Sequence, residues 1–145
     1  MTAVGGHDLA VGIDLVCVDD VAESFQRLGE HYLERLFTNE EVASCTVGGT
    51  ISPRALAVRF AAKEATIKAL QPKAEIPDWR TIEVLSLGKG HYDLALHGKA
   101  SQLADEAGLQ SFSLSLTCAA GLCMAFVVGS ALALPRSPKI GASQP

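Results

Sequence analysis

The chain has 145 residues, of which 48% are apolar and 19% are charged, and its formal net charge is −4. This composition is typical of a soluble globular protein and excludes a disordered chain, while the length favours one compact domain. The negative charge argues against nucleic acid or an anionic membrane surface as the main partner. The longest apolar run, residues 119–128, is about half of the roughly 20 residues that a membrane span needs. Because the start lacks the regions of a signal peptide, we expect a cytoplasmic protein.

The four cysteines show no pattern that indicates chemistry. They are Cys17, Cys45, Cys118 and Cys123, and no two of them form a C-x-x-C pair. No histidine stands at a spacing typical of a zinc site. We therefore expect reduced, mostly buried thiols.

The first predicted element is a strand over residues 9–18. Asp14 lies on one face with small and apolar neighbours, so it is a carboxylate in an otherwise apolar strand that we expect to be buried. The other face carries four large aliphatic residues: Leu9, Val11, Ile13 and Leu15.

Two helix starts follow. Asp20 with Glu23 resembles a capping box and predicts a helix from that point. Thr38 with Glu41 repeats the signal before a shorter helix. The pair of glycines at positions 48 and 49 then breaks the chain.

The clearest helix runs from Ser52 to Leu70. Ser52 is a favourable N-cap, proline occupies the first helical position, and a second proline ends the helix. Lys63 falls inside the apolar stripe of this helix, and Glu64 lies on the edge of the stripe beside Lys68. Charged groups on such a stripe are costly unless they are paired or bind a ligand. The stripe itself consists of Leu56, Phe60, Ile67 and Leu70.

The second half of the chain predicts an antiparallel sheet. Its elements are strands over 81–87 and 92–96, a helix over 99–107, and strands over 112–116 and 122–128. The fold class is therefore α+β, with an antiparallel sheet packed on one long helix. The predicted organisation is an N-terminal extension (1–8), a single domain (9–129) and a flexible C-terminal tail (130–145).

Each charged residue also has an ordinary structural explanation. Glu64 and Lys68 are four residues apart, which is the spacing of a common and weak ion pair on a helix surface. Lys63 could extend past the edge of the core to water, and Arg59 is expected at the surface. Asp14 could be satisfied by backbone amides at the end of its strand. From the residues alone these explanations stay open.

Two short motifs occur together in this order. Gly12-Ile13-Asp14 lies in the first strand, and Arg59-Phe60-Ala61-Ala62-Lys63-Glu64-Ala65 with Lys68 lies in the long helix. The combination resembles the two signature motifs of the 4′-phosphopantetheinyl transferase family, in particular its short bacterial holo-(acyl-carrier-protein) synthase type. The resemblance extends over residues 10–129, and it implies the 4′-phosphopantetheinyl transferase fold.

The resemblance implies magnesium-dependent transfer of the 4′-phosphopantetheine arm of coenzyme A to a serine of an apo carrier protein, with release of adenosine 3′,5′-bisphosphate. By this resemblance Asp14 and Glu64 bind Mg²⁺, which prefers oxygen ligands and usually binds through one or two carboxylates. Glu64 and Lys68 would be catalytic, with Lys68 holding the pyrophosphate and stabilising the leaving phosphate. The serine proton would leave through Glu64 or a metal-bound water.

The resemblance also implies the binding surfaces and the assembly. The carrier could serve fatty acid, polyketide or peptide synthesis. Short members of the family are homotrimers with active sites shared across subunit boundaries, so Lys63 would face a neighbour's ligand rather than a dry core. Six residues would contact coenzyme A: Arg59, Lys63, Lys68, Ser113, Ser115 and Thr117.

The chain departs from the family pattern at several positions. Ser113 and Cys118 stand where the family's last motif has histidines, at the nucleotide end of the site. Cys17 replaces a glutamate, Asp20 replaces an arginine that helps to dock the acidic carrier, and Tyr92 replaces the proline of a Gly-x-Pro turn. We therefore expect an intact metal end and altered nucleotide and carrier ends.

Two other functions stay open. One is a divergent relative that binds coenzyme A or a carrier with little or no turnover. The other is a structural or assembly protein in which Glu64 and Lys68 form an ordinary ion pair. The presence of Asp14, Lys63, Glu64 and Lys68 together favours the enzyme.

Overall fold

The computed structural model describes residues 8–132, so most of the predicted extension (1–8) and of the predicted tail (130–145) lies outside the described residues. None of the helices in residues 8–132 is long and apolar enough to cross a membrane. In chain order the elements are β1 (Leu9–Cys17), α1 (Val18–Leu28), α2 (Glu30–Leu36), α3 (Asn39–Ser44), β2 (Thr46–Val47), β3 (Thr50–Ile51), α4 (Pro53–Leu70), the 3-10 helix η1 (Trp79–Thr81), β4 (Ile82–Gly88), β5 (His91–Leu96), α5 (Gly98–Glu106), β6 (Ser111–Ala119) and β7 (Leu122–Ser130).

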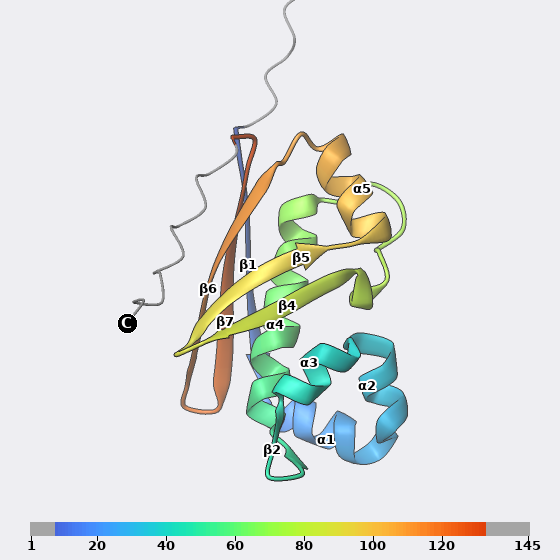
Figure 1. Ribbon diagram of the computed structural model, residues 1–145, viewed down its shortest axis with the longest axis vertical. Helices are drawn as coiled ribbons and strands as arrows, with labels where there is room; N and C mark the ends of the chain where they lie inside the picture. The colour runs from blue at the N-terminus through green and yellow to red at the C-terminus, as the bar shows by residue number, and fades with distance from the viewer. Residues whose placement is uncertain (1–7, 133–145) are drawn as a thin grey trace, which may run out of the picture.

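The long helix α4 lies at the centre of the fold (Figure 1). A three-stranded antiparallel sheet in the order β1-β7-β6 packs along it, and a separate hairpin of β4 and β5 lies across it. Helices α1, α2 and α3 gather at one end of α4, and α5 lies at the other end (Figure 1). The predicted α+β class, with an antiparallel sheet packed on one long helix, is confirmed.

The two faces of the three-stranded sheet have different surroundings. The face with Gly12 and Asp14 is turned toward α4. The opposite face is exposed, because no element of residues 8–132 covers it. The prediction that this strand is buried is therefore wrong for its outer face. Its large apolar side chains are each about 40–60% exposed: Leu9, Val11, Ile13 and Leu15 on β1, and Leu122, Met124 and Phe126 on β7.

Helix α4 begins as the sequence predicted. The Ser52 side chain accepts a hydrogen bond from the amide of Ala55, and Pro53 occupies the first turn. The buried part of α4 extends well beyond the predicted stripe, because strands, helices and the β4–β5 hairpin pack around it. Many of its buried residues are alanines, which let neighbouring backbones come close: Ala57, Ala61, Ala62, Ala65 and Ala69.

Lys63 is fully buried, and its partner comes from within the same chain. Its Nζ donates to Glu41 Oε1 at 2.7 Å, to the carbonyl of Trp79 at 2.9 Å and to the carbonyl of Ile82. Burial lowers the pKa of Lys63, and the charge of Glu41 opposes that shift. The expectation that Lys63 faces a neighbour's ligand is therefore wrong, because the core already supplies its counter-charge.

Glu41 has a second role that the sequence did predict. Thr38 and Glu41 form a reciprocal capping box at the start of α3. The same carboxylate also accepts from the amide of Val84 at 3.4 Å. One acidic side chain thus fastens α3, α4 and β4 together.

Other predictions about local structure are corrected. Helix α1 begins at Val18 directly after β1, with no side-chain cap, so the predicted capping box at Asp20 and Glu23 does not start it. The amide of Val18 instead donates to the carbonyl of Gly121 in the β6–β7 turn. Helix α2 and the short β2–β3 hairpin were not predicted.

The cysteine prediction is also wrong in part. Cys118 and Cys123 form a disulfide across the β6–β7 hairpin. Cys45 is a buried free thiol and Cys17 a half-buried one. The pairing was hidden in the sequence because it depends on the register of the two strands, in which these residues stand directly opposite each other.

Strand β1 lies directly against the backbone of α4 at Gly12. A Cβ atom at this position would lie 1.8 Å from the carbonyl oxygen of Ala65 and 2.9 Å from the amide nitrogen of Ala69. Both atoms belong to the helix backbone, so no side chain can rotate away to make room. Only glycine fits between the strand and the helix, and Asp14 stands two residues further along the same strand.

Replacement of Gly12 by alanine should push β1 away from α4. We expect Gly12→Ala to lower the free energy of unfolding by about 1–3 kcal/mol, as overpacking of a tight core does. Urea denaturation of the wild type and the variant measures this loss. Gly129→Ala in the adjacent strand is the matched control, because its added Cβ would meet only side-chain atoms, at 3.0 Å. Equal losses in both variants would contradict the special role of Gly12.

Candidate active site

Asp14 and Glu64 come together although 50 positions separate them in the chain. Asp14 projects from β1 toward α4, and its side chain is only 9% exposed. Burial raises the pKa of Glu64, and the nearby carboxyl group of Asp14 raises it further. Two carboxyl groups that lie close together in a half-buried place repel each other unless a proton or a cation lies between them.

Lys68 is the cation beside this pair. Its Nζ donates to Asp14 Oδ1 at 2.8 Å and to the carbonyl of Ile13 at 2.9 Å. Its hydrogen bond to Asp14 raises the pKa of Lys68. Lys68 on α4 thus pairs with Asp14 on β1 rather than with Glu64 one turn earlier in its own helix. The Lys68 side chain stays 55% exposed, so a ligand can reach it.

The second carboxylate oxygen of Asp14 is available for a cation. Oδ2 is buried and has no hydrogen-bond partner among the described residues. A buried oxygen without a partner is costly, and a bound cation would remove that cost. The possibility that backbone amides satisfy Asp14 is therefore not supported.

The donor set fits magnesium better than zinc. Within residues 8–132 no group of three or more His, Cys, Asp or Glu side chains could hold a metal ion. Two neighbouring carboxylates suit Mg²⁺, which commonly takes one or two protein oxygens and completes its shell with water and substrate phosphate. Asp14 and Glu64 are the residues that would hold it.

Arg59 and Lys63 point away from this surface. Arg59 is 2% exposed, so its predicted surface position is wrong. Its guanidinium donates to the carbonyl of Ala55 at 3.0 Å and to Ser44 Oγ at 2.9 Å, and it lies 5.5 Å from the centre of the Tyr92 ring. The enclosed amino group of Lys63 does not fit direct contact with coenzyme A, so Lys63 is not part of the site described here.

The three hydroxyl residues predicted to contact coenzyme A lie on the other side of the sheet. Ser113, Ser115 and Thr117 are exposed, and they alternate with residues that pack toward α4. Asp14 shares its register row with Ala125 and Leu116, which belong to the inner face. Within one chain these hydroxyls and Asp14 are therefore not brought together.

A hollow of about 470 Å³ lies between the start of α4, the β4–β5 hairpin and the end of β6. It contains one exposed arginine, Arg54, which the sequence did not single out because no motif marks it. Neither Asp14 nor Glu64 lines it. Its lining residues are Ser52, Arg54, Ala55, Val58, Gly90, Tyr92, Leu116, Thr117 and Cys118.

Comparison with known proteins gives consistent relatives. The chain is 36% identical over 129 residues to a protein of Herpetosiphon aurantiacus named holo-[acyl-carrier-protein] synthase. The aligned region covers 83% of this chain and 98% of that protein. A protein of Leptospira biflexa with the same name is 37% identical over 121 residues, covering 83% and 94%.

Solved structures agree with these relatives. The holo-[acyl-carrier-protein] synthase of Neisseria meningitidis has a TM-score of 0.71 at 29% identity, covering 83% of this chain and 97% of that one. The Helicobacter pylori enzyme in complex with coenzyme A has a TM-score of 0.69 at 28% identity, covering 83% and 99%.

A family model describes nearly the whole of the folded region. The model of the 4′-phosphopantetheinyl transferase superfamily matches residues 10–127, which include β1 with Asp14 and α4 with Glu64 and Lys68. Together with relatives more than 30% identical over most of their length, this match shows that the chain belongs to the 4′-phosphopantetheinyl transferase superfamily.

Proposed function

We propose that this protein is a holo-(acyl-carrier-protein) synthase, which transfers the 4′-phosphopantetheine arm of coenzyme A to a serine of an apo carrier protein. The observation that carries the proposal is the meeting of Asp14 and Glu64 beside Lys68, with one buried Asp14 oxygen unpartnered. The names of the relatives support the same activity, and the Helicobacter pylori complex supports coenzyme A as the donor.

The reaction breaks the phosphoanhydride bond of coenzyme A. The carrier serine oxygen attacks the phosphorus on the pantetheine side, and adenosine 3′,5′-bisphosphate leaves with the electron pair of the broken bond. Such transfers depend on positioning and on neutralisation of developing charge. Magnesium, held by Asp14 and Glu64, would supply positive charge at the diphosphate.

The two ionised groups from α4 have separate tasks in this scheme. The exposed amino group of Lys68 can donate to the diphosphate and stabilise the negative leaving group. The proton of the carrier serine would leave through Glu64 or through a water bound to the metal.

We propose a homotrimer, as the family resemblance implies, and the exposed sheet face supports association between copies of the chain. Its seven apolar side chains, three of which are Ile13, Leu15 and Phe126, form a surface that a single chain leaves in water. Ser113, Ser115 and Thr117 stand beside them on the same face. We propose that a second copy covers this face and that these hydroxyls contribute to a neighbour's coenzyme A site.

Removal of either carboxylate should abolish transfer while the fold persists. We expect Asp14→Asn and Glu64→Gln each to reduce transfer at least about a hundredfold, the lower range for loss of a positioned acid–base group. Mass spectrometry of an apo carrier incubated with coenzyme A and magnesium measures the added phosphopantetheine. Asp105→Asn and Glu75→Gln, which change exposed carboxylates away from the site, are the matched controls.

Different outcomes of this experiment separate the alternatives. A wild-type protein that binds coenzyme A but modifies no carrier would favour a binding protein without turnover. Full activity in both site variants would refute the assignment of Asp14 and Glu64.

Magnesium should stabilise the wild-type protein in the presence of coenzyme A. Ligands that bind only the folded state at about a hundred times their dissociation constant add about 2.7 kcal/mol to the free energy of unfolding. Thermal melting with and without magnesium chloride measures the shift, with sodium chloride of equal ionic strength as the salt control. We expect the shift to disappear in Glu64→Gln, and an equal shift in that variant would contradict the metal site.

The assembly can be tested by light scattering after size exclusion. We expect three times the chain mass of 15.2 kDa for the wild type. Phe126→Lys should dissociate the assembly, because it places a charge within the apolar face. Val47→Lys is the matched control, since Val47 is 76% exposed at the β2–β3 hairpin. A monomeric wild type would overturn the proposed trimer.

A further inference from the structure

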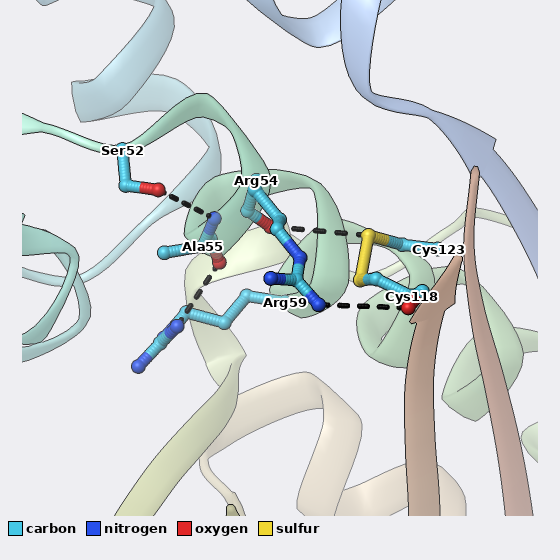
Figure 2. Close-up of a disulfide and its surroundings, with 6 residues drawn as sticks. All are labelled: Ser52, Arg54, Ala55, Arg59, Cys118 and Cys123. Atoms are coloured by element: carbon cyan, nitrogen blue, oxygen red, sulfur yellow. Dashed lines mark hydrogen bonds between the residues drawn. A yellow bond between two sulfur atoms is a disulfide. The ribbon is translucent and has the colours of Figure 1, made fainter. Parts of the chain in front are cut away.

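The Cys118–Cys123 disulfide lies where the β6–β7 hairpin meets the first turn of α4 (Figure 2). The Arg54 guanidinium donates to the carbonyl of Cys118 at 3.5 Å. The Sγ of Cys123 lies 3.9 Å from the carbonyl oxygen of Arg54. The disulfide and Arg54 are thus linked through both cysteines.

This disulfide should stabilise the folded state less than disulfides that close longer loops. It closes a loop with a sequence separation of only five residues, and the stabilisation from a cross-link grows with the length of the loop it closes. The two residues are also already opposite each other in a hydrogen-bonded hairpin. The fold therefore does not depend on the bond, and the bond can open without unfolding the chain.

The two sulfur atoms differ in access. Cys123 is fully buried, whereas Cys118 is half-buried and lines the 470 Å³ hollow beside Arg54. When the bond opens, the two sulfur atoms must move apart from bonding distance to a van der Waals contact. Because Cys123 is fully buried and Cys118 lines the hollow, the Cys118 thiol is the one that can turn into the hollow.

We propose that Cys118–Cys123 is a thiol–disulfide exchange site and that its oxidation state sets how tightly the hollow binds the nucleotide part of coenzyme A. This inference rests on the proposed function, which makes coenzyme A the donor. A cationic Arg54 and an aromatic Tyr92 in the lining suit an anionic, planar group. The disulfide keeps the lining of this hollow in place, so the oxidised protein binds the nucleotide part of coenzyme A more tightly than the reduced protein does.

The exchange partner is a dithiol. One of its thiolates attacks the accessible Cys118 Sγ, the Cys118–Cys123 bond breaks, and Cys123 Sγ leaves as a thiolate that takes up a proton. The second thiol of the reagent then attacks the mixed disulfide and releases Cys118 as a thiol. Two electrons and two protons pass to the protein, and the reagent becomes a disulfide.

The other cysteines are not suited to this exchange. Burial raises the pKa of Cys45 to about 11, which keeps it a thiol of low reactivity. Cys17 follows Val16, the register partner of Cys123, so its side chain belongs to the opposite face of the sheet. These two positions serve as internal controls.

The experiment compares one preparation of the full-length wild type in buffers with reduced or oxidised dithiothreitol. Alkylation with N-ethylmaleimide at neutral pH followed by peptide mass spectrometry reports the state of each cysteine. The KM for coenzyme A in carrier modification, and its dissociation constant by calorimetry, report the hollow. We expect both constants to rise about fivefold or more on reduction, the lower end of typical coupling between sites, and to recover on reoxidation.

Matched variants separate the exchange from general effects of the reagent. In the double variant Cys118→Ser/Cys123→Ser, the two constants for coenzyme A should not change with the redox state of the buffer. The Cys17→Ser variant should respond as the wild type does. The proposal would be overturned if N-ethylmaleimide labelled Cys118 and Cys123 in every buffer. It would also be overturned if the KM and the dissociation constant for coenzyme A were equal in the reduced and the oxidised protein. If neither state modifies a carrier, the proposed function fails, whereas the calorimetry still decides whether the disulfide controls binding.

Discussion

The site depends on one backbone contact, the approach of β1 to α4 at Gly12. The strand lies so close to the helix that a single methyl group would collide with the carbonyl of Ala65. This closeness carries Asp14 to Glu64 and lets Lys68 reach both Asp14 and the carbonyl of Ile13. Because the contact is between main-chain atoms, the distance of the Asp14 backbone from α4 does not depend on side-chain rotamers.

Helix α4 directs its charged residues to two environments. Arg59 and Lys63 point into the fold, where Arg59 donates to Ser44 beside the Tyr92 ring and Lys63 pairs with Glu41. Their neighbours on the helix surface, Glu64 and Lys68, reach β1 at an accessible edge. The inward pair holds the surrounding elements in place, and the outward pair is the one that we propose takes part in the chemistry, so one short motif combines a structural part and a proposed reactive part.

The sheet has a comparable division between its faces. Its inner face packs on α4 and supplies Asp14, while its outer face carries apolar side chains and the hydroxyls of β6. A chain that leaves such a face in water is suited to association with copies of itself. The disulfide at the end of β6 belongs to the inner face, where it joins the hairpin to the start of α4 and borders the hollow beside Arg54.

The sequence by itself determined the long helix, its Ser52 cap, the capping box at Thr38 and the strands, because these depend on local periodicity and on neighbouring residues. It also singled out Asp14, Glu64 and Lys68 through a family motif, and the structure brings these three side chains together, while their roles in the reaction stay a proposal. Only the tertiary structure decided that Lys63 pairs with Glu41, that Arg59 is buried and that Cys118 bonds to Cys123. Those outcomes depend on which distant segments pack together, and local patterns carry no information about that.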